Sequence, residues 1–271
     1  MTSGSSQALA DASATPRVAV HDAHVGRTLR IVAGEGRAWA VIWPGMGAKS
    51  RSLHRVSLAP AASTVALRHA GEAVYYVLSG VGAVHDTAGA AHPLQEGSMV
   101  HIAPQGGYRF AAGATALELI GGPCPPDPAL YEGAGSGNEE TEPDRPGGVR
   151  IFHRDDPGVR VPLISRNARL IVWLGVGAET ANMNFVRLEP GEANVPHIHP
   201  ESEDTIYILE GRGTVADFDH DRRLRFAAGQ VLHVPTGIKH AVYADRGQAV
   251  VSVGGPAPAD RHMLRAAGLL V

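Results

Sequence analysis

The residues best suited to chemistry are two histidines that lie two positions apart, His197 and His199, followed by Asp204. Alternate side chains of an extended segment point to the same side, so both imidazoles should face one direction. A third histidine, His240, follows a Pro-Thr-Gly turn further along the chain. Neutral imidazoles and a carboxylate suit a divalent transition metal. The spacing therefore predicts a site for one metal ion.

Short strands and turns must position these side chains. Residues 200–203 are polar and predict a turn, and the β-branched and aromatic run at 204–209 predicts a returning strand that ends before Gly211. From Gly229 the sequence predicts a strand, a turn at 235–237 and a second strand that begins at His240. Asp204 and His240 are thus expected at the starts of strands.

The first histidine segment resembles a motif of the cupin superfamily. That motif reads Gly, five residues, His-x-His, three or four residues, Glu, six residues, Gly. The chain matches it at four positions: Gly191, His197, His199 and Gly211. Asp204 stands where the family usually has Glu, which is the main departure. The resemblance implies an all-β fold, in which a double-stranded β-helix forms a jelly-roll barrel.

The second segment resembles the second cupin motif, which reads Gly, five residues, Pro-x-Gly, two residues, His, three residues, Asn. The chain matches it at Gly229, Pro235, Gly237 and His240, and Ala244 replaces the final Asn. By this resemblance the metal ligands would be His197, His199, His240 and Asp204. Glu203 is an alternative carboxylate, because its side chain is one methylene longer.

An internal repeat indicates that the barrel is duplicated. Trp43-Pro-Gly-Met-Gly and Trp173-Leu-Gly-Val-Gly match at a spacing of 130 residues, and His69 pairs with His199 at the same spacing. Pro104-Gln-Gly pairs with Pro235-Thr-Gly at 131. With the resemblance added, the chain is expected to be a bicupin. Its parts would be a disordered arm at 1–17, an N-terminal barrel at 18–125, a flexible linker at 126–147, and a C-terminal barrel at 148–271 that ends in a short amphipathic helix.

The N-terminal copy lacks most of the ligand set. Only His69 remains, while Leu67, Ala73 and Arg109 are expected at the other three positions. A guanidinium stays charged and has no lone pair to donate, so no metal is expected in this barrel. An anion pocket is an alternative to ordinary solvent-facing charges for four residues: Arg68, His69, His101 and Arg109.

Composition limits the other classes of function. The chain has 271 residues, 44% of them hydrophobic, with 33 Gly and 19 Pro, which favours many short strands and turns. The net charge of −3 and the absence of a basic stripe argue against nucleic acid. No apolar stretch approaches the ~18–20 residues of a membrane span, and no secretory signal is evident, so a soluble, cytoplasmic protein is expected. Cys124 is the only cysteine, which excludes an intrachain disulfide.

Strand parity predicts an apolar pocket around the metal. Ile206 and Ile208 share the face of Asp204, and Val242 and Ala244 share that of His240. The parity of His233 is ambiguous, and it is either a pocket residue or a packed, hydrogen-bonded histidine.

Three classes of function fit such a site. The first is a dioxygenase using Fe, Mn, Ni or Cu, and the second is a Lewis-acid isomerase, cyclase, lyase or decarboxylase, which Zn also supports. The third is a non-catalytic barrel that binds a small ligand. Because the duplicated chain keeps a full ligand set in one barrel only, the two barrels are expected to have different roles. We therefore expect a metal-dependent enzyme acting on a small oxygenated organic molecule, with dioxygenase as the leading assignment and a homo-oligomer as a possible assembly.

Overall fold

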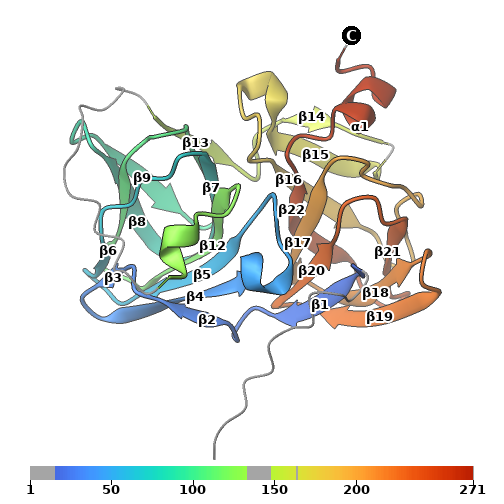
Figure 1. Ribbon diagram of the computed structural model, residues 1–271, viewed down its shortest axis with the longest axis horizontal. Helices are drawn as coiled ribbons and strands as arrows, with labels where there is room; N and C mark the ends of the chain where they lie inside the picture. Colours follow the sequence, from blue (N-terminus) through green and yellow to red (C-terminus); the bar gives the residue numbers. More distant parts are fainter. Residues whose placement is uncertain (1–15, 133–147, 163, 271) are drawn as a thin grey trace, which may run out of the picture.

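The computed structural model describes residues 16–132, 148–162 and 164–270. The chain folds as two β-barrels that lie side by side (Figure 1). This confirms the expected all-β class with two tandem jelly-roll barrels. Most of the predicted arm, and residues 133–147 of the predicted linker, lie outside the described residues.

The N-terminal barrel is built from two antiparallel sheets. The larger has the order β13 (Val149–His153), β10 (Ser98–Ile102), β7 (Glu72–Ser79), β12 (Leu117–Cys124), β5 (Leu53–Leu58), β4 (Gly36–Ile42), β2 (Arg27–Leu29). The smaller has the order β3 (Val32–Ala33), β6 (Ser63–Thr64), β11 (Tyr108–Ala112), β8 (Val81–Asp86), β9 (Ala91–Gln95). Two short 3-10 helices accompany them, η1 (Pro44–Met46) and η2 (Pro128–Leu130).

The C-terminal barrel repeats this plan. Its larger sheet has the order β1 (Ala19–Asp22), β20 (Gln230–Val234), β17 (Glu203–Glu210), β22 (Val250–Ala257), β16 (Met183–Leu188), β15 (Asn167–Val172), β14 (Val159–Arg160). Its smaller sheet has the order β19 (Arg222–Ala227), β18 (Arg212–Asp217), β21 (His240–Ala244). A 3-10 helix η3 (Leu174–Val176) and the helix α1 (Arg261–Ala266) complete it. Within the described residues, no helix is long and apolar enough to cross a membrane.

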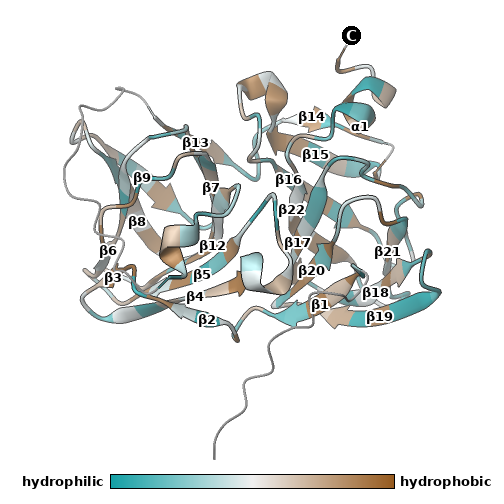
Figure 2. Ribbon diagram, in the orientation of Figure 1, coloured by the Kyte–Doolittle hydropathy of each residue, from teal (hydrophilic) through white to brown (hydrophobic). Residues whose placement is uncertain are grey.

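Each larger sheet is apolar on both faces. One face encloses the interior of its own barrel, and the other packs against the neighbouring barrel, where Tyr76, Met99 and Ile120 meet Tyr207 and Val253. Figure 2 shows hydrophobic and hydrophilic residues interspersed along the strands of both barrels. Burial of a continuous apolar layer between the two sheets holds the barrels together.

The repeat is also visible in the turns. Trp43 precedes η1 and Trp173 precedes η3, and each of these 3-10 helices ends at a glycine in the left-handed region: Gly47 at φ 90° and Gly177 at φ 81°. Residues with a Cβ rarely adopt this conformation, which explains why glycine recurs at both positions.

Two edge strands lie in the opposite barrel from the one that the sequence predicts. Strand β13, expected to open the C-terminal barrel, pairs with β10 of the N-terminal sheet. Strand β1, expected in the N-terminal barrel, pairs with β20 of the C-terminal sheet. Figure 1 shows both strands at these positions. The reason is physical: β10 and β20 each offer an unpaired edge that the nearest stretch of chain satisfies.

A pair of buried glutamates joins the barrels reciprocally. Glu72 of β7 accepts hydrogen bonds from the backbone amides of Glu179, Thr180 and Ala181 in the other barrel. In the equivalent place, Glu203 of β17 accepts hydrogen bonds from the amides of residues 49 and 50 at 2.7 and 3.0 Å. Each carboxylate thus satisfies backbone donors that folding removes from water.

Candidate metal centre

Three imidazoles converge at one end of the C-terminal barrel. The backbones of His197 and His240 pair with each other through two hydrogen bonds of 3.0 Å each. His199 follows on the same extended segment, which is held by a hydrogen bond from the Gly237 amide to its carbonyl. The segment is extended as expected, although it lies outside the named strands. One ring nitrogen of each histidine lies within 4.8 Å of the other two.

Hydrogen bonds fix the orientation of all three rings. Nδ1 of His197 donates to the carbonyl of Val195, and Nδ1 of His240 donates to that of Ile238. Nδ1 of His199 lies 2.5 Å from Oδ2 of Asp260. An imidazole that donates through Nδ1 carries its free lone pair on Nε2 when it is neutral. Each ring can therefore offer Nε2 to a metal ion.

Asp204, the predicted fourth ligand, lies beside the histidines. Its Oδ2 lies 3.5 Å from Nε2 of His199 and 3.9 Å from Nε2 of His240. Oδ1 of Asp204 and Nε2 of both histidines are buried and have no hydrogen-bond partner among the described residues. Buried polar atoms rarely remain unpaired, and a divalent cation would pair both nitrogens. The residues present thus fit a transition metal.

The histidines differ in their affinity for protons. Burial lowers the pKa of His240 to about 4 and also lowers that of His197. Burial opposes charge on His199 as well, but Asp204 and Asp260 outweigh it and raise its pKa to about 9. Burial also disfavours ionised Asp204, yet the contact with His199 keeps the Asp204 pKa below its ordinary value. Without metal, His199 therefore pairs as an imidazolium with two carboxylates.

The alternative carboxylate, Glu203, does not reach the histidines. Neighbouring residues of a strand point to opposite faces, so Glu203 faces the N-terminal barrel while Asp204 faces the interior of its own. The structure thus contradicts Glu203 as the alternative ligand.

Asp260 contacts a proposed metal ligand, and the sequence motifs did not predict this contact. It caps α1 by accepting a hydrogen bond from the Met263 amide, and its other oxygen accepts from His199. Asp127 occupies the same place in the N-terminal barrel, where it caps η2 and contacts His69 at 2.8 Å. The sequence does indicate that the two aspartates are equivalent, because Cys-Pro-Pro-Asp and Ala-Pro-Ala-Asp match at a spacing of 133 residues.

Residues 126–132 belong to the N-terminal barrel and do not form the start of a linker. Asp127 contacts His69, and Leu130 and Tyr131 are buried in the interior of the barrel. Tyr131 also contacts Nε2 of His54 at 2.7 Å through its hydroxyl. Aromatic and aliphatic side chains hold this segment in place, which the proline-rich sequence does not reveal.

Tyr108, and not Arg109, occupies the position of His240 in the N-terminal barrel. Tyr108 pairs with Leu67 through the same two backbone hydrogen bonds that join His240 to His197. The correct spacing in this hairpin is therefore 132 residues, with Gln105 at φ 62° in the place of Gly237 at φ 80°. Matching the two turns by their Pro-x-Gly letters moved the alignment by one residue.

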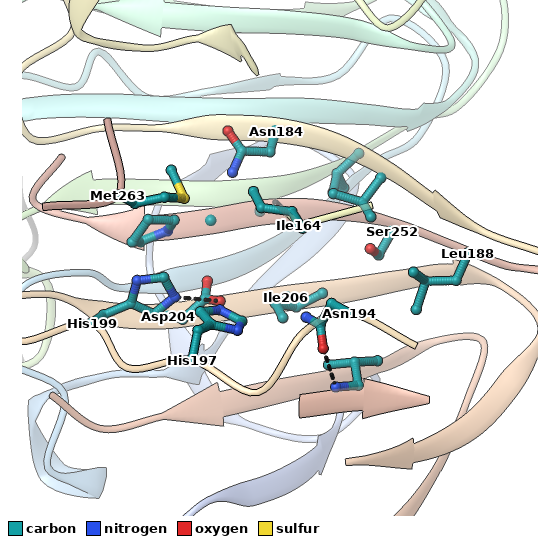
Figure 3. Close-up of a pocket in the computed structure, with 16 residues that line it drawn as sticks. Ile164, Asn184, Leu188, Asn194, His197, His199, Asp204, Ile206, Ser252 and Met263 are labelled. Atoms are coloured by element: carbon teal, nitrogen blue, oxygen red, sulfur yellow. Dashed lines mark hydrogen bonds and ion pairs between the residues drawn. The ribbon is translucent and has the colours of Figure 1, made fainter. Parts of the chain in front are cut away.

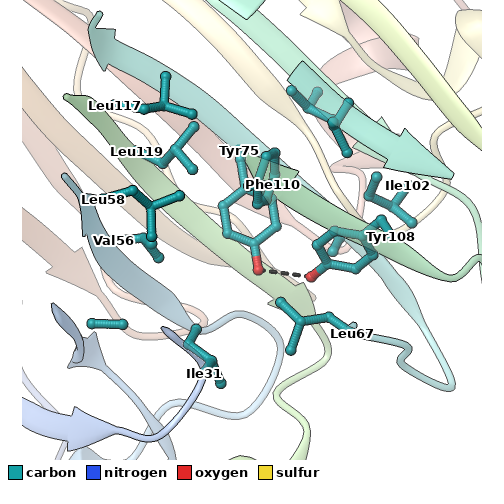
Figure 4. Close-up of a cluster of buried hydrophobic side chains, with 14 of the residues drawn as sticks. Ile31, Val56, Leu58, Leu67, Tyr75, Ile102, Tyr108, Phe110, Leu117 and Leu119 are labelled. Carbon is teal, nitrogen blue, oxygen red and sulfur yellow. Dashed lines mark hydrogen bonds between the residues drawn. The ribbon is translucent and has the colours of Figure 1, made fainter. Parts of the chain in front are cut away.

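The interior of the N-terminal barrel is filled by aromatic rings and holds no metal site among the described residues. The hydroxyls of Tyr75 and Tyr108 lie 2.8 Å apart. Figure 4 shows this contact with Leu67 beside it. Tyr108 also contacts Nε2 of His69 at 2.9 Å, so the only histidine kept at a ligand position is already paired.

The anion pocket considered for this barrel does not form. His69 faces the interior, whereas Arg109 is exposed. His101 contacts Glu72 at 3.2 Å and Arg150 at 3.0 Å on the outer face of its sheet. Its counterpart His233 lies on the opposite face of β20 from Val234, the residue that pairs with Asp204. His233 is thus packed outside the cavity, and its Nε2 has no partner in the part of the chain that the structure describes.

A small cavity of about 50 Å³ opens from the histidines into the barrel (Figure 3). Its walls are mainly aliphatic and include Ile206 and Val242, as the strand parity predicts. The other two predicted pocket residues, Ile208 and Ala244, pack in the core. The polar groups that line the cavity besides the proposed ligands are side chains of Asn184, Asn194 and Ser252, together with backbone groups.

Comparison with known proteins identifies the family. The model of the cupin domain family matches residues 54–120 and 184–253, one match in each barrel. Germin-like protein 3-5 of Oryza sativa subsp. japonica is 31% identical over 74 residues, which are 25% of this chain and 33% of that protein. The polyketide synthase CurC of Streptomyces cyaneus is 35% identical over 71 residues, which are 26% of this chain and 45% of that protein. The match thus spans about a third of the germin-like relative and less than half of CurC.

Two solved structures show the same arrangement of paired barrels. An oxalate decarboxylase of Lactobacillus farciminis, in complex with formate, has a TM-score of 0.65 at 16% identity and covers 92% of this chain and 88% of its own. Protein Ylba of E. coli has a TM-score of 0.65 at 17% identity, with 91% and 95% covered. The family matches together cover half of the chain, one in each barrel, and the protein belongs to the cupin family as a bicupin.

Proposed function

We propose that the chain is a metal-dependent bicupin enzyme that acts on a small oxygenated organic molecule as a dioxygenase. One divalent transition metal ion would be held by His197, His199, His240 and Asp204. When bound, such an ion would supply open coordination positions at which a substrate oxygen and dioxygen can meet. The partly buried position of the site supports catalysis over a structural role, because structural metals are normally closed off by protein ligands.

The observation that carries this proposal is the scarcity of acid–base groups in the cavity. Among the described residues that line it, the titratable groups are His197, His199 and Asp204, all of them proposed ligands. Isomerases and decarboxylases need a side chain that is free to move a proton. Oxygenation of an acidic enol or hydroxy-carbonyl compound depends less on such a group. The lining therefore favours the dioxygenase assignment.

The same lining indicates the polarity of the substrate. Asn194 accepts a hydrogen bond from the Val242 amide through Oδ1, which leaves its Nδ2 to donate to a ligand oxygen. Oδ1 of Asn184 is buried without a partner and can accept from a substrate hydroxyl. No Lys or Arg is among the described residues that line the cavity, so a small dianion such as oxalate would meet no cation there except the metal. The partial similarity to a polyketide synthase agrees with a carbon skeleton that bears several oxygens.

A second candidate is non-redox chemistry, such as decarboxylation or isomerisation. The unpartnered Oδ1 of Asp204 favours it, because a carboxylate oxygen that does not bind the metal could accept a proton from the substrate. The paired-barrel fold also occurs in oxalate decarboxylases. Ligand binding without turnover is the third candidate.

Oxygen consumption separates the three candidates. The protein, loaded in turn with Fe(II), Mn(II), Ni(II), Cu(II) or Zn(II), would be mixed anaerobically with a panel of 1,3-diketones, enols and hydroxy-ketones before oxygen is admitted. We expect oxygen uptake in step with substrate loss for a redox-active metal and none for Zn(II). Equal turnover under argon would move the assignment to non-redox chemistry, and binding with no turnover would support the third candidate.

A further inference from the structure

A second and larger cavity, of about 470 Å³, adjoins the metal cavity. The two cavities share three lining residues, Ile164, His197 and Met263. Ile164 and Met263 are labelled in Figure 3. The two cavities therefore adjoin at these side chains. We call the outer cavity the mouth groove.

Much of the wall of the mouth groove is apolar. Its walls include Val195 and Ile198, which are 63% and 42% exposed. Large aliphatic side chains gain free energy when apolar surface is removed from water, so their exposure beside a catalytic cavity favours a ligand. They lie on the same segment as the metal ligands, directly next to His197.

The groove has one cationic side chain in its described lining. Lys239 is exposed and forms no ion pair among the described residues. Asp260 also lines the groove, but both of its oxygens are engaged, one by His199 and one by the Met263 amide. The inner cavity, by contrast, has no Lys or Arg in its described lining. The groove thus combines an apolar wall with a positive edge.

We infer that the substrate is an elongated amphipathic molecule, with an oxygenated head at the metal, an apolar body in the mouth groove and an anionic end beside Lys239. This inference rests on the proposed metal site and names the class of substrate. Each methylene that the groove buries should tighten binding by about fourfold. The contact with an exposed ammonium group should add about threefold at low salt.

Metal-chelating probes of graded length test the inference without turnover. Hydroxamates bind divalent metals through two oxygens, so acetohydroxamate, octanohydroxamate and the octanohydroxamate with a terminal carboxylate would report the head, the body and the anionic end in turn. Calorimetry on the Zn(II)-loaded full chain should show octanohydroxamate binding at least a hundredfold more tightly than acetohydroxamate. The terminal carboxylate should tighten binding further, and salt should reverse this gain.

Single substitutions test the apolar wall and the cationic group of the groove separately. Ile198→Asn should weaken the binding of octanohydroxamate at least fivefold and leave the binding of acetohydroxamate unchanged. Val25→Asn, at an exposed valine outside the described lining of the groove, should change neither affinity. Lys239→Gln should remove only the gain from the terminal carboxylate. Its control is Arg246→Gln, an exposed cation that is not in the described lining of the groove and should preserve that gain.

Equal affinity for the short and long probes would overturn the inference, as would a loss of the carboxylate gain in Arg246→Gln but not in Lys239→Gln. If acetohydroxamate fails to bind the metal-loaded chain, the metal site itself is wrong and the inference fails with it. Chain-length dependence in a protein that consumes no oxygen would support the mouth groove and contradict only the dioxygenase assignment.

Discussion

Asp260 accepts a hydrogen bond from Nδ1 of His199 at 2.5 Å, so the residue that caps the C-terminal helix also orients a proposed metal ligand. The N-terminal barrel keeps the same relationship between Asp127 and His69, at 2.8 Å, without a ligand set around it. The two aspartates therefore form a matched pair, one beside a complete site and one beside an incomplete site.

The first prediction concerns this pair. Asp260→Asn keeps a good helix cap but weakens the partner of His199, so metal affinity should fall by about 10- to 100-fold. Asp127→Asn should leave it unchanged. Competition with a chromophoric chelator measures both, and similar losses in the two variants would contradict a specific role for Asp260.

The second prediction concerns the ligands. His197→Ala and His240→Ala should each abolish stoichiometric metal binding, because each removes a nitrogen that converges on the site. His69→Ala is the control, since its Nε2 is paired with Tyr108, and it should retain one metal per chain. Asp204→Ala should weaken binding, and Glu203→Ala should not. Elemental analysis decides, and metal retained in both C-terminal histidine variants would refute the assignment.

The third prediction concerns pH. With its pKa raised to about 9, His199 is protonated at neutral pH without metal, and binding must release that proton. His240, with a pKa of about 4, is already neutral. Metal affinity should therefore increase roughly tenfold per pH unit from neutral pH towards 9 and level off above it. Calorimetry in two buffers of different protonation enthalpy should show about one proton released, and no dependence on the buffer would contradict the prediction.

The sequence predicted the two barrels and the convergence of the three histidines, because both depend on local patterns. His-x-His fixes two imidazoles on one side of an extended segment, and Asp204 begins a strand whose alternation places it inside. Contacts between distant segments were harder to predict. Asp260 lies 61 positions after His199, and nothing in either local pattern indicates that they meet.

The sequence also did not reveal that the two equivalent hairpins differ in alignment by one residue. Gln105 adopts the left-handed conformation that Gly237 adopts in the other copy. The two turns therefore align by residue type at a position that differs by one residue from the alignment of their backbones. Tyr108 thereby takes the place that the sequence comparison gave to Arg109. Backbone pairing, and not residue identity, decides which side chain faces the interior.

The fourth prediction tests this correction. The combined substitution Leu67→His, Ala73→Asp and Tyr108→His should give the N-terminal barrel a complete ligand set around His69, and the chain should then bind two equivalents of Zn(II). A matched variant with Arg109→His in place of Tyr108→His should bind one, because Arg109 is exposed on the outer face. Zinc titration with a competing chelator, after circular dichroism has verified folding, distinguishes them. A second equivalent in the Arg109 variant alone would restore the original alignment.

The fifth prediction concerns the contact between the barrels. Burial disfavours the charge of Glu72, but the contact with His101 and the hydrogen bonds from Thr180 outweigh it and lower the Glu72 pKa to about 2. A depressed carboxyl pKa stabilises the fold above the unfolded value and loses that effect as pH falls towards 2. Glu72→Gln should lower the free energy of unfolding by about 1.5–3 kcal/mol at pH 7 and by less near pH 3.

Glu96→Gln is the control for this prediction, because the side chain of Glu96 is exposed and forms an ion pair with Arg154, and such pairs contribute little. Urea denaturation at both pH values provides the measurement. An equal loss for the two variants, or a loss that grows at low pH, would contradict the role assigned to Glu72.

The exchanged edge strands β1 and β13 also bear on how the protein can be dissected. A cut between residues 133 and 147 would leave each fragment carrying one strand of the other's sheet, while its own sheet would have an open edge at β10 or β20. Co-produced fragments should assemble by donating these strands to each other. Either fragment alone should be prone to edge-to-edge aggregation. We therefore expect the smallest independently folding unit to be the interlocked pair, and not the single barrel.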